Sequence, residues 1–117
     1  MVYNKGTIKQ KGSIDMAVLN VTKENFSEIG NSAKPVLLDF YADWCGPCRM
    51  VSPLVDEIAE EHSEFTVGKI NVDDQPELAA AFGVSSIPML AVMKNGAVTA
   101  HAVGARPKSA ILDMLKG

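Results

Sequence analysis

The chain has 117 residues, of which 47% are hydrophobic and 21% charged, and these proportions are typical of one soluble globular domain. The formal net charge of −3 argues against a nucleic-acid partner, and no apolar run reaches the ~18 residues of a membrane-spanning helix. The two cysteines, three positions apart, indicate a working thiol pair in a reducing compartment and not a disulfide framework.

The first fifteen residues differ from the rest of the chain. Three lysines against one aspartate give residues 1–15 a charge of +2, which leaves −5 for the remainder. The segment lacks the apolar run of about 7–15 residues found in secretory signals. We interpret it as an extension of a domain that spans residues 16–117. It is either a tag remnant or an upstream start, with Met16 as the natural initiator, or else an arm that binds a partner.

The first half of the domain is predicted to alternate strands with helices. Residues 17–21 form an edge strand, and Thr22 caps a short helix that reaches about Ile29. After a loop, Pro35 opens a strand whose run of apolar side chains indicates burial. That strand covers residues 36–41.

Cys45 and Cys48 lie where this buried strand ends and the next helix begins. The helix is predicted from Gly46 to His62, with a kink at Pro53. Residues three apart in a first helical turn share one face, with Cβ atoms roughly 5–6 Å apart, so the pair suits a reversible disulfide.

The start of this helix also sets the chemistry of the sulfurs. Its free N–H groups and positive dipole favour a thiolate, which is the nucleophilic form of cysteine. Cys45 is nearest the helix start and is predicted to attack, while Cys48 is predicted to be the more buried, resolving sulfur. Pro47 loses no useful N–H in the first turn, and Gly46 lets a partner chain come close.

The second half of the domain is predicted to contain a strand, a helix, a hairpin and a last helix. The strand covers residues 65–72, and the helix is capped and started by residues 73–76 and ends near Phe82. The hairpin strands are residues 89–93 and 97–103, and Arg106-Pro107 opens the last helix. The hairpin is indicated by Asn95-Gly96. Alternating strands and helices imply parallel pairing, and the hairpin adds an antiparallel pair. The expected fold class is therefore α/β, with a mixed sheet of about five strands and about four helices.

The motif Trp44-Cys45-Gly46-Pro47-Cys48, after a hydrophobic strand that carries Asp39, resembles the active site of thioredoxins. The resemblance runs from about Ala17 to Lys116 and further includes Pro53, Lys69, Ile87-Pro88, Lys94-Asn95-Gly96 and Val103-Gly104-Ala105. It implies a thioredoxin-like three-layer sandwich and a general protein-disulfide reductase that cycles Cys45 and Cys48 through a mixed disulfide. It also implies no bound cofactor, substrates that are disulfide-containing proteins, and regeneration by a thioredoxin reductase. We further expect a cytoplasmic monomer.

Two charged residues are assigned by the resemblance. Asp39 matches a buried carboxylate behind the second cysteine that accepts or donates its proton through water. Its alternation with Leu37 and Tyr41 places it among apolar neighbours, where burial should raise its pKa; the alternative is a solvent-facing aspartate. Lys69 matches the family lysine near that carboxylate, and it is either a tuning residue or a solvated strand lysine.

The resemblance also makes Ile87-Pro88 a cis-proline turn that faces the dithiol. Because Pro88 has no N–H, the Ile87 backbone is free to pair with an extended substrate. We expect a shallow apolar docking surface formed by Trp44, Gly46, Pro47, Val72, Ile87, Pro88, Val103, Gly104 and Ala105. For Val72 and Val103 the alternative is a place in the core.

The remaining polar residues point to no second site. His62 and His101 lack the spacing of a Cys2His2 site, so no metal is expected; they are interpreted as a helix C-terminal residue and a strand-face residue. The acidic residues of the helix after the motif are interpreted as a solvated face. They are Asp56, Glu57, Glu60 and Glu61.

The chain departs from the family pattern at Tyr41, Arg49 and Met89, where Trp, Lys and Thr are usual. Met89 follows the proline that faces the sulfurs, so the reduction potential stays open. Two other functions also stay open. One is an oxidase or isomerase on the same fold, and the other is an assembly subunit that binds through this surface without turnover.

Overall fold

The computed structural model describes residues 17–117, so the predicted extension at residues 1–15 lies outside the described residues. In chain order the elements are β1 (Val18–Asn20), α1 (Phe26–Gly30), β2 (Val36–Tyr41), α2 (Gly46–Glu61), β3 (Thr66–Asn71), α3 (Pro76–Ala81), β4 (Met89–Lys94), β5 (Ala97–Val103) and α4 (Lys108–Lys116). The predicted types and order of the elements are confirmed.

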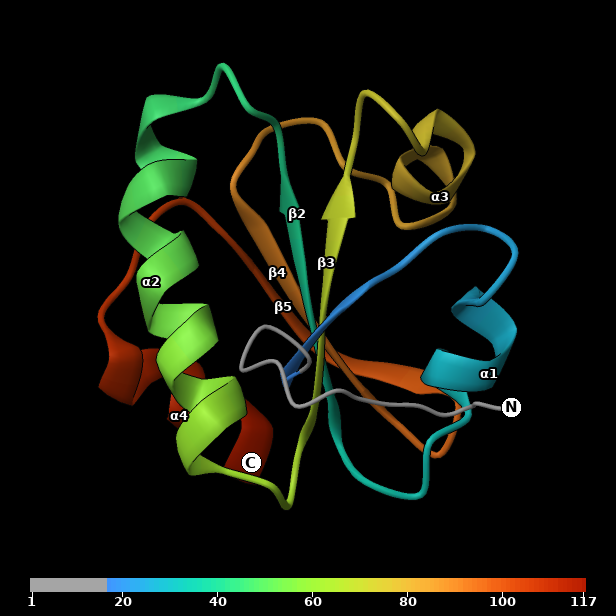
Figure 1. Ribbon diagram of the computed structural model, residues 1–117, viewed down its shortest axis with the longest axis vertical. Helices are drawn as coiled ribbons and strands as arrows, with labels where there is room; N and C mark the ends of the chain where they lie inside the picture. Colours follow the sequence, from blue (N-terminus) through green and yellow to red (C-terminus); the bar gives the residue numbers. More distant parts are fainter. Residues whose placement is uncertain (1–16) are drawn as a thin grey trace.

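The sheet lies between two pairs of helices, with α2 and α4 on one face and α1 and α3 on the other (Figure 1). Its strand order is β1-β3-β2-β4-β5. Strand β3 pairs in parallel with both β1 and β2, whereas β4 pairs antiparallel with β2 and β5. The predicted three-layer α/β sandwich with a mixed sheet is therefore confirmed.

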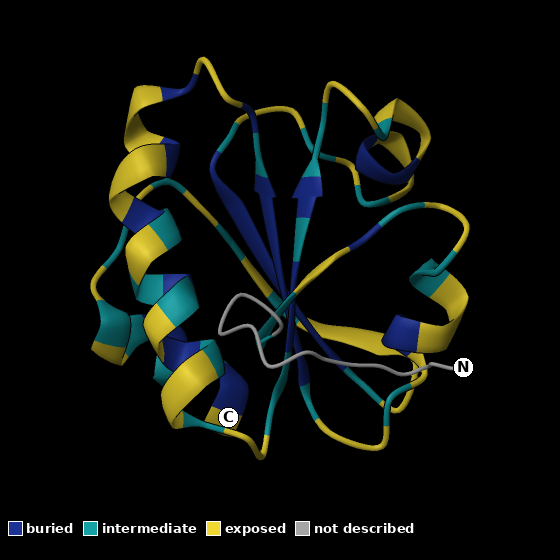
Figure 2. Ribbon diagram, in the orientation of Figure 1, coloured by how far each residue is buried: buried dark blue, intermediate teal, exposed yellow. Residues whose placement is uncertain are grey.

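The central strands β2 and β4 carry the core, and Figure 2 shows them buried along most of their length. Because side chains alternate across a strand, β2 feeds both faces of the sheet. Leu38 and Phe40 pack in the cluster that includes α1 and α3, and Leu37 packs with Val51 and Val55 of α2. Asp39 shares the α2 face with Leu37, which places a carboxylate in the apolar layer between the sheet and α2.

The start of helix α1 differs from the prediction. Helix α1 begins at Phe26, four residues after Thr22, and its N-cap is Asn25. The Asn25 side chain instead accepts a hydrogen bond from the Thr22 N–H at 2.8 Å, which closes a local turn before the helix. A short polar side chain that bonds nearby backbone groups competes with helix formation. The sequence pattern does not show whether Thr22 or Asn25 makes such a bond.

Helix α3 follows the prediction, since it starts at Pro76 and its N-cap lies within the predicted segment, residues 73–76. The N-cap is Gln75, whose side chain makes no capping hydrogen bond. The backbone N–H groups of Asp73 and Asp74 bind Asn71 Oδ1 at 2.9 and 3.4 Å. This turn leaves the Asp73 carboxylate free to contact a residue elsewhere in the chain.

The hairpin and the end of α2 follow the prediction. Asn95 and Gly96 have φ angles of 54° and 80°, so both adopt the left-handed conformation that a tight hairpin turn requires. His62 is the C-cap of α2, as its interpretation as a helix C-terminal residue requires, and the helix continues through Pro53 as one element.

Candidate active site

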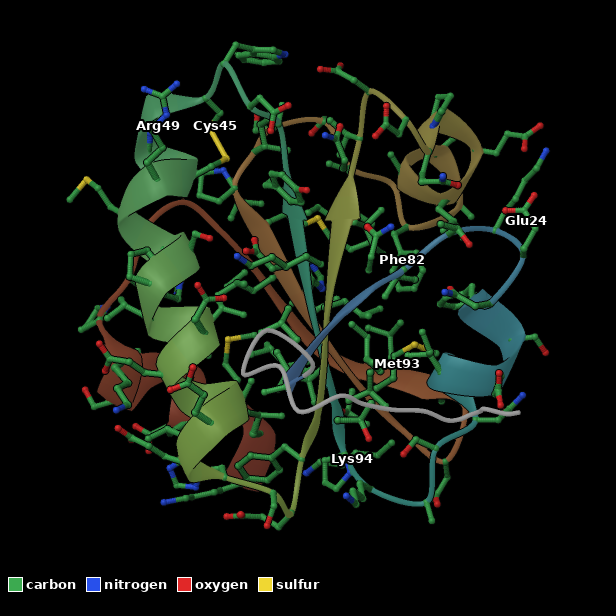
Figure 3. The ribbon with its side chains drawn as sticks, in the orientation of Figure 1. Glu24, Cys45, Arg49, Phe82, Met93 and Lys94 are labelled. Carbon is green, nitrogen blue, oxygen red and sulfur yellow. A yellow bond between two sulfur atoms is a disulfide. The ribbon has the colours of Figure 1, made fainter. Side chains whose placement is uncertain are left out.

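The cysteine pair lies at the carboxyl end of β2, where the chain enters α2. Cys45 is the N-cap of α2 and has an extended backbone, with φ −87° and ψ 113°; Cys48 lies in the first turn. A disulfide joins the two residues, whose Cα atoms are 5.4 Å apart, and it is the yellow bond beside the Cys45 label in Figure 3. This separation is within the ordinary range of about 4.4–6.8 Å for disulfides.

The helix terminus interacts directly with the first sulfur. Cys45 Sγ accepts a hydrogen bond from the Cys48 N–H at 3.2 Å, and this donor is one of those that a helix start leaves unpaired. Cys45 and Cys48 are 4% and 3% exposed, so burial does not set Cys48 apart as the deeper sulfur. Their positions on the helix do distinguish them, because Cys45 is the N-cap and so lies nearer the positive end of the helix dipole than Cys48 does.

Asp39 is a buried carboxylate in the middle of β2. It is 1% exposed, and neither of its oxygens has a hydrogen-bond partner among the described residues. Burial raises the pKa of Asp39 to about 7, while the charge of Lys69 acts to lower this pKa and that of Asp56 acts to raise it. The alternative of a solvent-facing aspartate is therefore wrong.

Lys69 lies beside Asp39 on β3, in register with it. Its ammonium donates to Ser52 Oγ and pairs with Asp56 Oδ1 at 3.1 Å, both on α2, and its side chain is 19% exposed. Lys69 is therefore not a solvated strand lysine. The contact also corrects the interpretation of Asp56, which binds the sheet beneath it and is not merely part of a solvated face.

The other acidic residues of α2 have more ordinary roles. Glu57 and Glu61 pair with Lys108 of α4 at 3.1 and 2.6 Å, so they link the two helices that cover this face of the sheet. Glu60 is exposed. The prediction of a solvated face therefore fits Glu60, whereas Asp56, Glu57 and Glu61 each pair with a lysine.

Trp44 stands before the disulfide as a largely exposed aromatic side chain, 69% accessible. Its Nε1 donates to Asp73 Oδ2 at 2.9 Å. It borders a shallow groove of about 410 Å³ whose lining also includes Val72, Ser85 and Ile87. No sequence signal marks Asp73 as the residue that orients this tryptophan, because the two are 29 positions apart.

The peptide bond between Ile87 and Pro88 is cis, as the resemblance implied. Ile87 packs against the small cluster of Ala42, Cys45 and Cys48, and the Pro88 carbonyl accepts a hydrogen bond from the Gly104 N–H at 2.8 Å. The turn therefore lies against the disulfide and is tied to the end of β5.

Five of the nine predicted docking residues line three separate hollows. Pro88 is buried and so is not part of the exposed surface, and Gly46, Pro47 and Gly104 line none of the three hollows. Trp44, Val72 and Ile87 share the groove beside the disulfide. Val103 lines a second hollow, and Ala105 lines a third with the exposed Met50. Sequence reasoning did not select Met50.

For Val72 and Val103, the alternative to a docking role is a place in the core, and the two residues differ in this respect. Val103 is 51% exposed, so the core alternative is wrong for it. Val72 is half-buried and packs against both the disulfide cluster and the core on the α1 and α3 face, so it combines the two roles.

The three departures from the family pattern lie in different surroundings. Met89 is 5% exposed and packs in the core beside α1 and α3. Arg49 extends from α2 and donates to the Asp43 carbonyl at 2.9 Å (Figure 3). Tyr41 lines a hollow with Asp56 and Lys69, and burial raises its pKa.

Within residues 17–117, no three or more His, Cys, Asp or Glu side chains are grouped so as to hold a metal ion. The helices of this same range include none that is long and apolar enough to cross a membrane. His101 is exposed on β5, in agreement with its interpretation as a strand-face residue.

The chemistry available here is that of two sulfurs joined at a helix start, one of them hydrogen-bonded to the helix backbone. Formation and cleavage of that bond transfers two electrons. Together with the mixed sheet, this makes the protein a thiol–disulfide oxidoreductase whose redox group is the Cys45–Cys48 disulfide.

Comparisons with known proteins identify the family. The thioredoxin family model matches residues 17–117. A thioredoxin of Pyropia yezoensis is 52% identical over 102 residues, covering 86% of this chain and 95% of that protein. A thioredoxin of Haemophilus influenzae is 46% identical over 100 residues, covering 84% and 94%. The structure of a mutant thioredoxin from Halobacterium salinarum superimposes with a TM-score of 0.80 at 36% identity, over 85% of this chain and 88% of that one. The chain belongs to the thioredoxin family.

Proposed function

We propose that the protein is a general protein-disulfide reductase that cycles through a mixed disulfide with its substrate. The observation that carries the proposal is the hydrogen bond from the Cys48 N–H to Cys45 Sγ at the N-cap of α2. In the reduced protein, the same donor and the helix dipole favour a thiolate at Cys45, and a thiolate is the attacking species in disulfide exchange.

The reaction takes place in two exchanges. The Cys45 thiolate attacks one sulfur of the substrate disulfide, forms the mixed disulfide and displaces the other substrate sulfur as a thiolate. Cys48 then loses its proton and attacks Cys45 Sγ, which closes the Cys45–Cys48 disulfide and releases the second substrate thiolate. The substrate gains two electrons and the protein loses them.

Asp39 is the proposed proton acceptor for Cys48, acting through water. A group with a pKa of about 7 is poised to accept or donate a proton near neutral pH. Its burial between the sheet and α2 supports this role, because no other carboxylate of the described residues is buried there. Lys69 is the proposed tuning residue, since its charge opposes the rise in the pKa of Asp39.

An extended segment of the substrate is proposed to dock beside the disulfide. The Ile87 backbone would pair with it next to Pro88, in the manner of an added strand. The groove between Trp44 and Ile87 would take an apolar side chain of the substrate, and Gly46 and Pro47 would leave room for its backbone. The Val103-Gly104-Ala105 segment would form the opposite border.

The family implies disulfide substrates and recycling by a thioredoxin reductase in general. For this chain we propose disulfide-containing proteins as substrates, a monomeric state and a cytoplasmic location. The location is supported by the pairing of both cysteines at the active site, which leaves none for a structural disulfide. We further propose that residues 16–117 are the thioredoxin domain and that residues 1–15 are an extension of it.

The proposal is tested by following the reduction of insulin in the presence of dithiothreitol. The wild-type protein should accelerate precipitation of the reduced insulin chains, and Cys45→Ser should not. A wild-type protein without activity would favour the binding subunit.

Titration of the Cys45–Cys48 couple against glutathione separates a reductase from an oxidase. Thioredoxin is itself the reference case for a reducing couple, at about −270 mV, and this value belongs to the family and not to the present structure. A potential near −120 mV, as in strong oxidases, would contradict the proposal.

A further inference from the structure

The buried Asp39 carboxylate has no cationic partner in direct contact among the described residues, although an ammonium lies on the neighbouring strand. Asp39 and Lys69 are in register on the parallel strands β2 and β3, so their side chains leave the sheet on the same face. The Lys69 ammonium nevertheless binds Ser52 Oγ and Asp56 Oδ1. Within residues 17–117, both oxygens of Asp39 lack a hydrogen bond.

The two groups that bind Lys69 come from one face of α2. Ser52 and Asp56 are four residues apart, which places them one above the other on a helix. The first turn of α2 carries Cys48, so the element that positions the resolving sulfur also binds the ammonium. The sheet supplies the lysine, and the helix determines where its charge lies.

Few charged and titratable groups of the described residues face this region. Lys69 faces it from β3 and Asp56 from α2, and Tyr41 and Glu60 line the same hollow as these two residues. From β4, the residue in register with Asp39 is Leu90, which is apolar and fully buried. Of the described residues, Lys69 and Asp56 are the charges that act on the pKa of Asp39, and a shift of the Lys69 ammonium would change this pKa without changing any charge.

We propose that Ser52 and Asp56 are positioning residues that hold the Lys69 ammonium against α2 and so keep it from pairing directly with Asp39. The inference rests on the proposed role of Asp39 as proton acceptor. A direct ion pair would lower the pKa of the carboxylate and use its lone pairs, and the carboxylate would then be a poor base near neutral pH. The helix thus keeps the carboxylate available to Cys48.

The test is the titration of Asp39 in the full-length oxidised protein, followed by the ¹³C shift of its carboxyl carbon in NMR spectra. Ser52→Ala removes one ligand of the ammonium without changing any charge, and it should lower the pKa of Asp39 by about one. Ser52→Thr restores a hydroxyl and should titrate as the wild type does. Ser109→Ala, at an exposed position of α4, is the matched control and should leave the titration unchanged.

A double-mutant cycle shows whether the effect passes through the lysine. In a Lys69→Met background, Ser52→Ala should no longer move the pKa of Asp39. An unchanged or raised pKa in the Ser52→Ala single variant would overturn the proposal, and so would a shift that persists without the lysine. Both titrations are measured without turnover. A protein without reductase activity would therefore refute the proposed function, whereas the effect of Ser52→Ala on the pKa of Asp39 would still decide the positioning proposal.

Discussion

At the scale of single residues, Asp39 lowers the stability of the fold while providing a group that titrates near neutral pH. Its pKa is about 7 in the folded protein, against a reference value of 3.8. At pH 3 and below, the carboxyl is protonated in both the folded and unfolded states, so it adds no pH dependence. As pH rises from about 4 to 7 the unfolded chain ionises first, so the free energy of unfolding falls, and the loss is complete above pH 7.

We predict that Asp39→Asn stabilises the protein at pH 8 but not at low pH. The rise in the pKa of Asp39 from 3.8 to about 7 corresponds to a loss of about 4 kcal/mol in the free energy of unfolding. This value is the upper bound for the gain in Asp39→Asn, because the new amide is also buried. Urea unfolding of the oxidised protein at pH 3 and pH 8 measures the difference. The same gain at both values would show that Asp39 ionises normally in the folded state. Reductase turnover should fall in this variant, since Cys48 loses its proton acceptor.

Trp44 is the second residue with a prediction of its own. Its ring is exposed beside the disulfide and is oriented by Asp73, so it is placed to contact a substrate. Trp44→Ala should lower kcat/KM for a protein disulfide by about tenfold, which equals about 1.4 kcal/mol, because aromatic residues dominate binding at interfaces. The free energy of unfolding should change little, since the side chain is not in the core. An unchanged kcat/KM would remove Trp44 from the docking surface.

At the scale of elements, the sequence predicted the strands and helices well but not the side-chain hydrogen bonds at the helix starts. Runs of apolar residues and the Asn95-Gly96 turn are local signals, and these elements formed as expected. The cap predicted at Thr22 was wrong, because the Asn25 side chain bonds the Thr22 N–H before the helix starts. At α3 the N-cap Gln75 lies in the predicted segment but makes no side-chain capping bond, and Asn71 binds the backbone of the preceding turn. Several polar residues near a helix start compete for the same N–H groups, and their sequence does not decide among them.

The contact between α2 and β3 illustrates a second limit. Ser52 and Asp56 have the spacing of one helix face, which was visible in the sequence. Their shared partner Lys69 could be recognised only once the register of β3 beneath α2 was known. The resemblance pointed to Lys69 as a tuning residue but offered no reason to select the two helix residues that bind it.

Strand β3 also has a position where an added side chain would overlap a buried neighbour. Gly68 lies between β1 and β2 in the sheet, and a Cβ there would overlap the side chain of Val21, which is fully buried. Gly68→Ala should lower the free energy of unfolding by about 1–3 kcal/mol, the usual cost of overpacking a core. Gly46→Ala is the matched control for stability, because a Cβ there meets nothing within 4 Å. Equal unfolding midpoints in urea for both variants would contradict this packing.

At the scale of the whole molecule, the fold brings together parts of the active site that are far apart in sequence. The disulfide lies at the start of α2, Ile87 reaches it from the loop before β4, and Asp73 reaches Trp44 from the loop after β3. The motif and the cis-proline could be predicted from the family resemblance. The contact of Asp73, the exposure of Met50 and the division of the docking surface depend on tertiary packing, which local patterns do not encode.

The central claim is that Cys45 attacks and Cys48 resolves, and covalent trapping tests it most directly. Each single Cys→Ser variant is reduced, freed of reductant, mixed with cell lysate and quenched with acid. Proteins are then compared on non-reducing and reducing gels. Cys48→Ser should accumulate mixed disulfides that disappear on reduction, because serine cannot release the bound substrate. Cys45→Ser should trap little, because its remaining thiol lies one turn from the dipole end. Equal trapping by the two variants, or greater trapping by Cys45→Ser, would contradict the assignment.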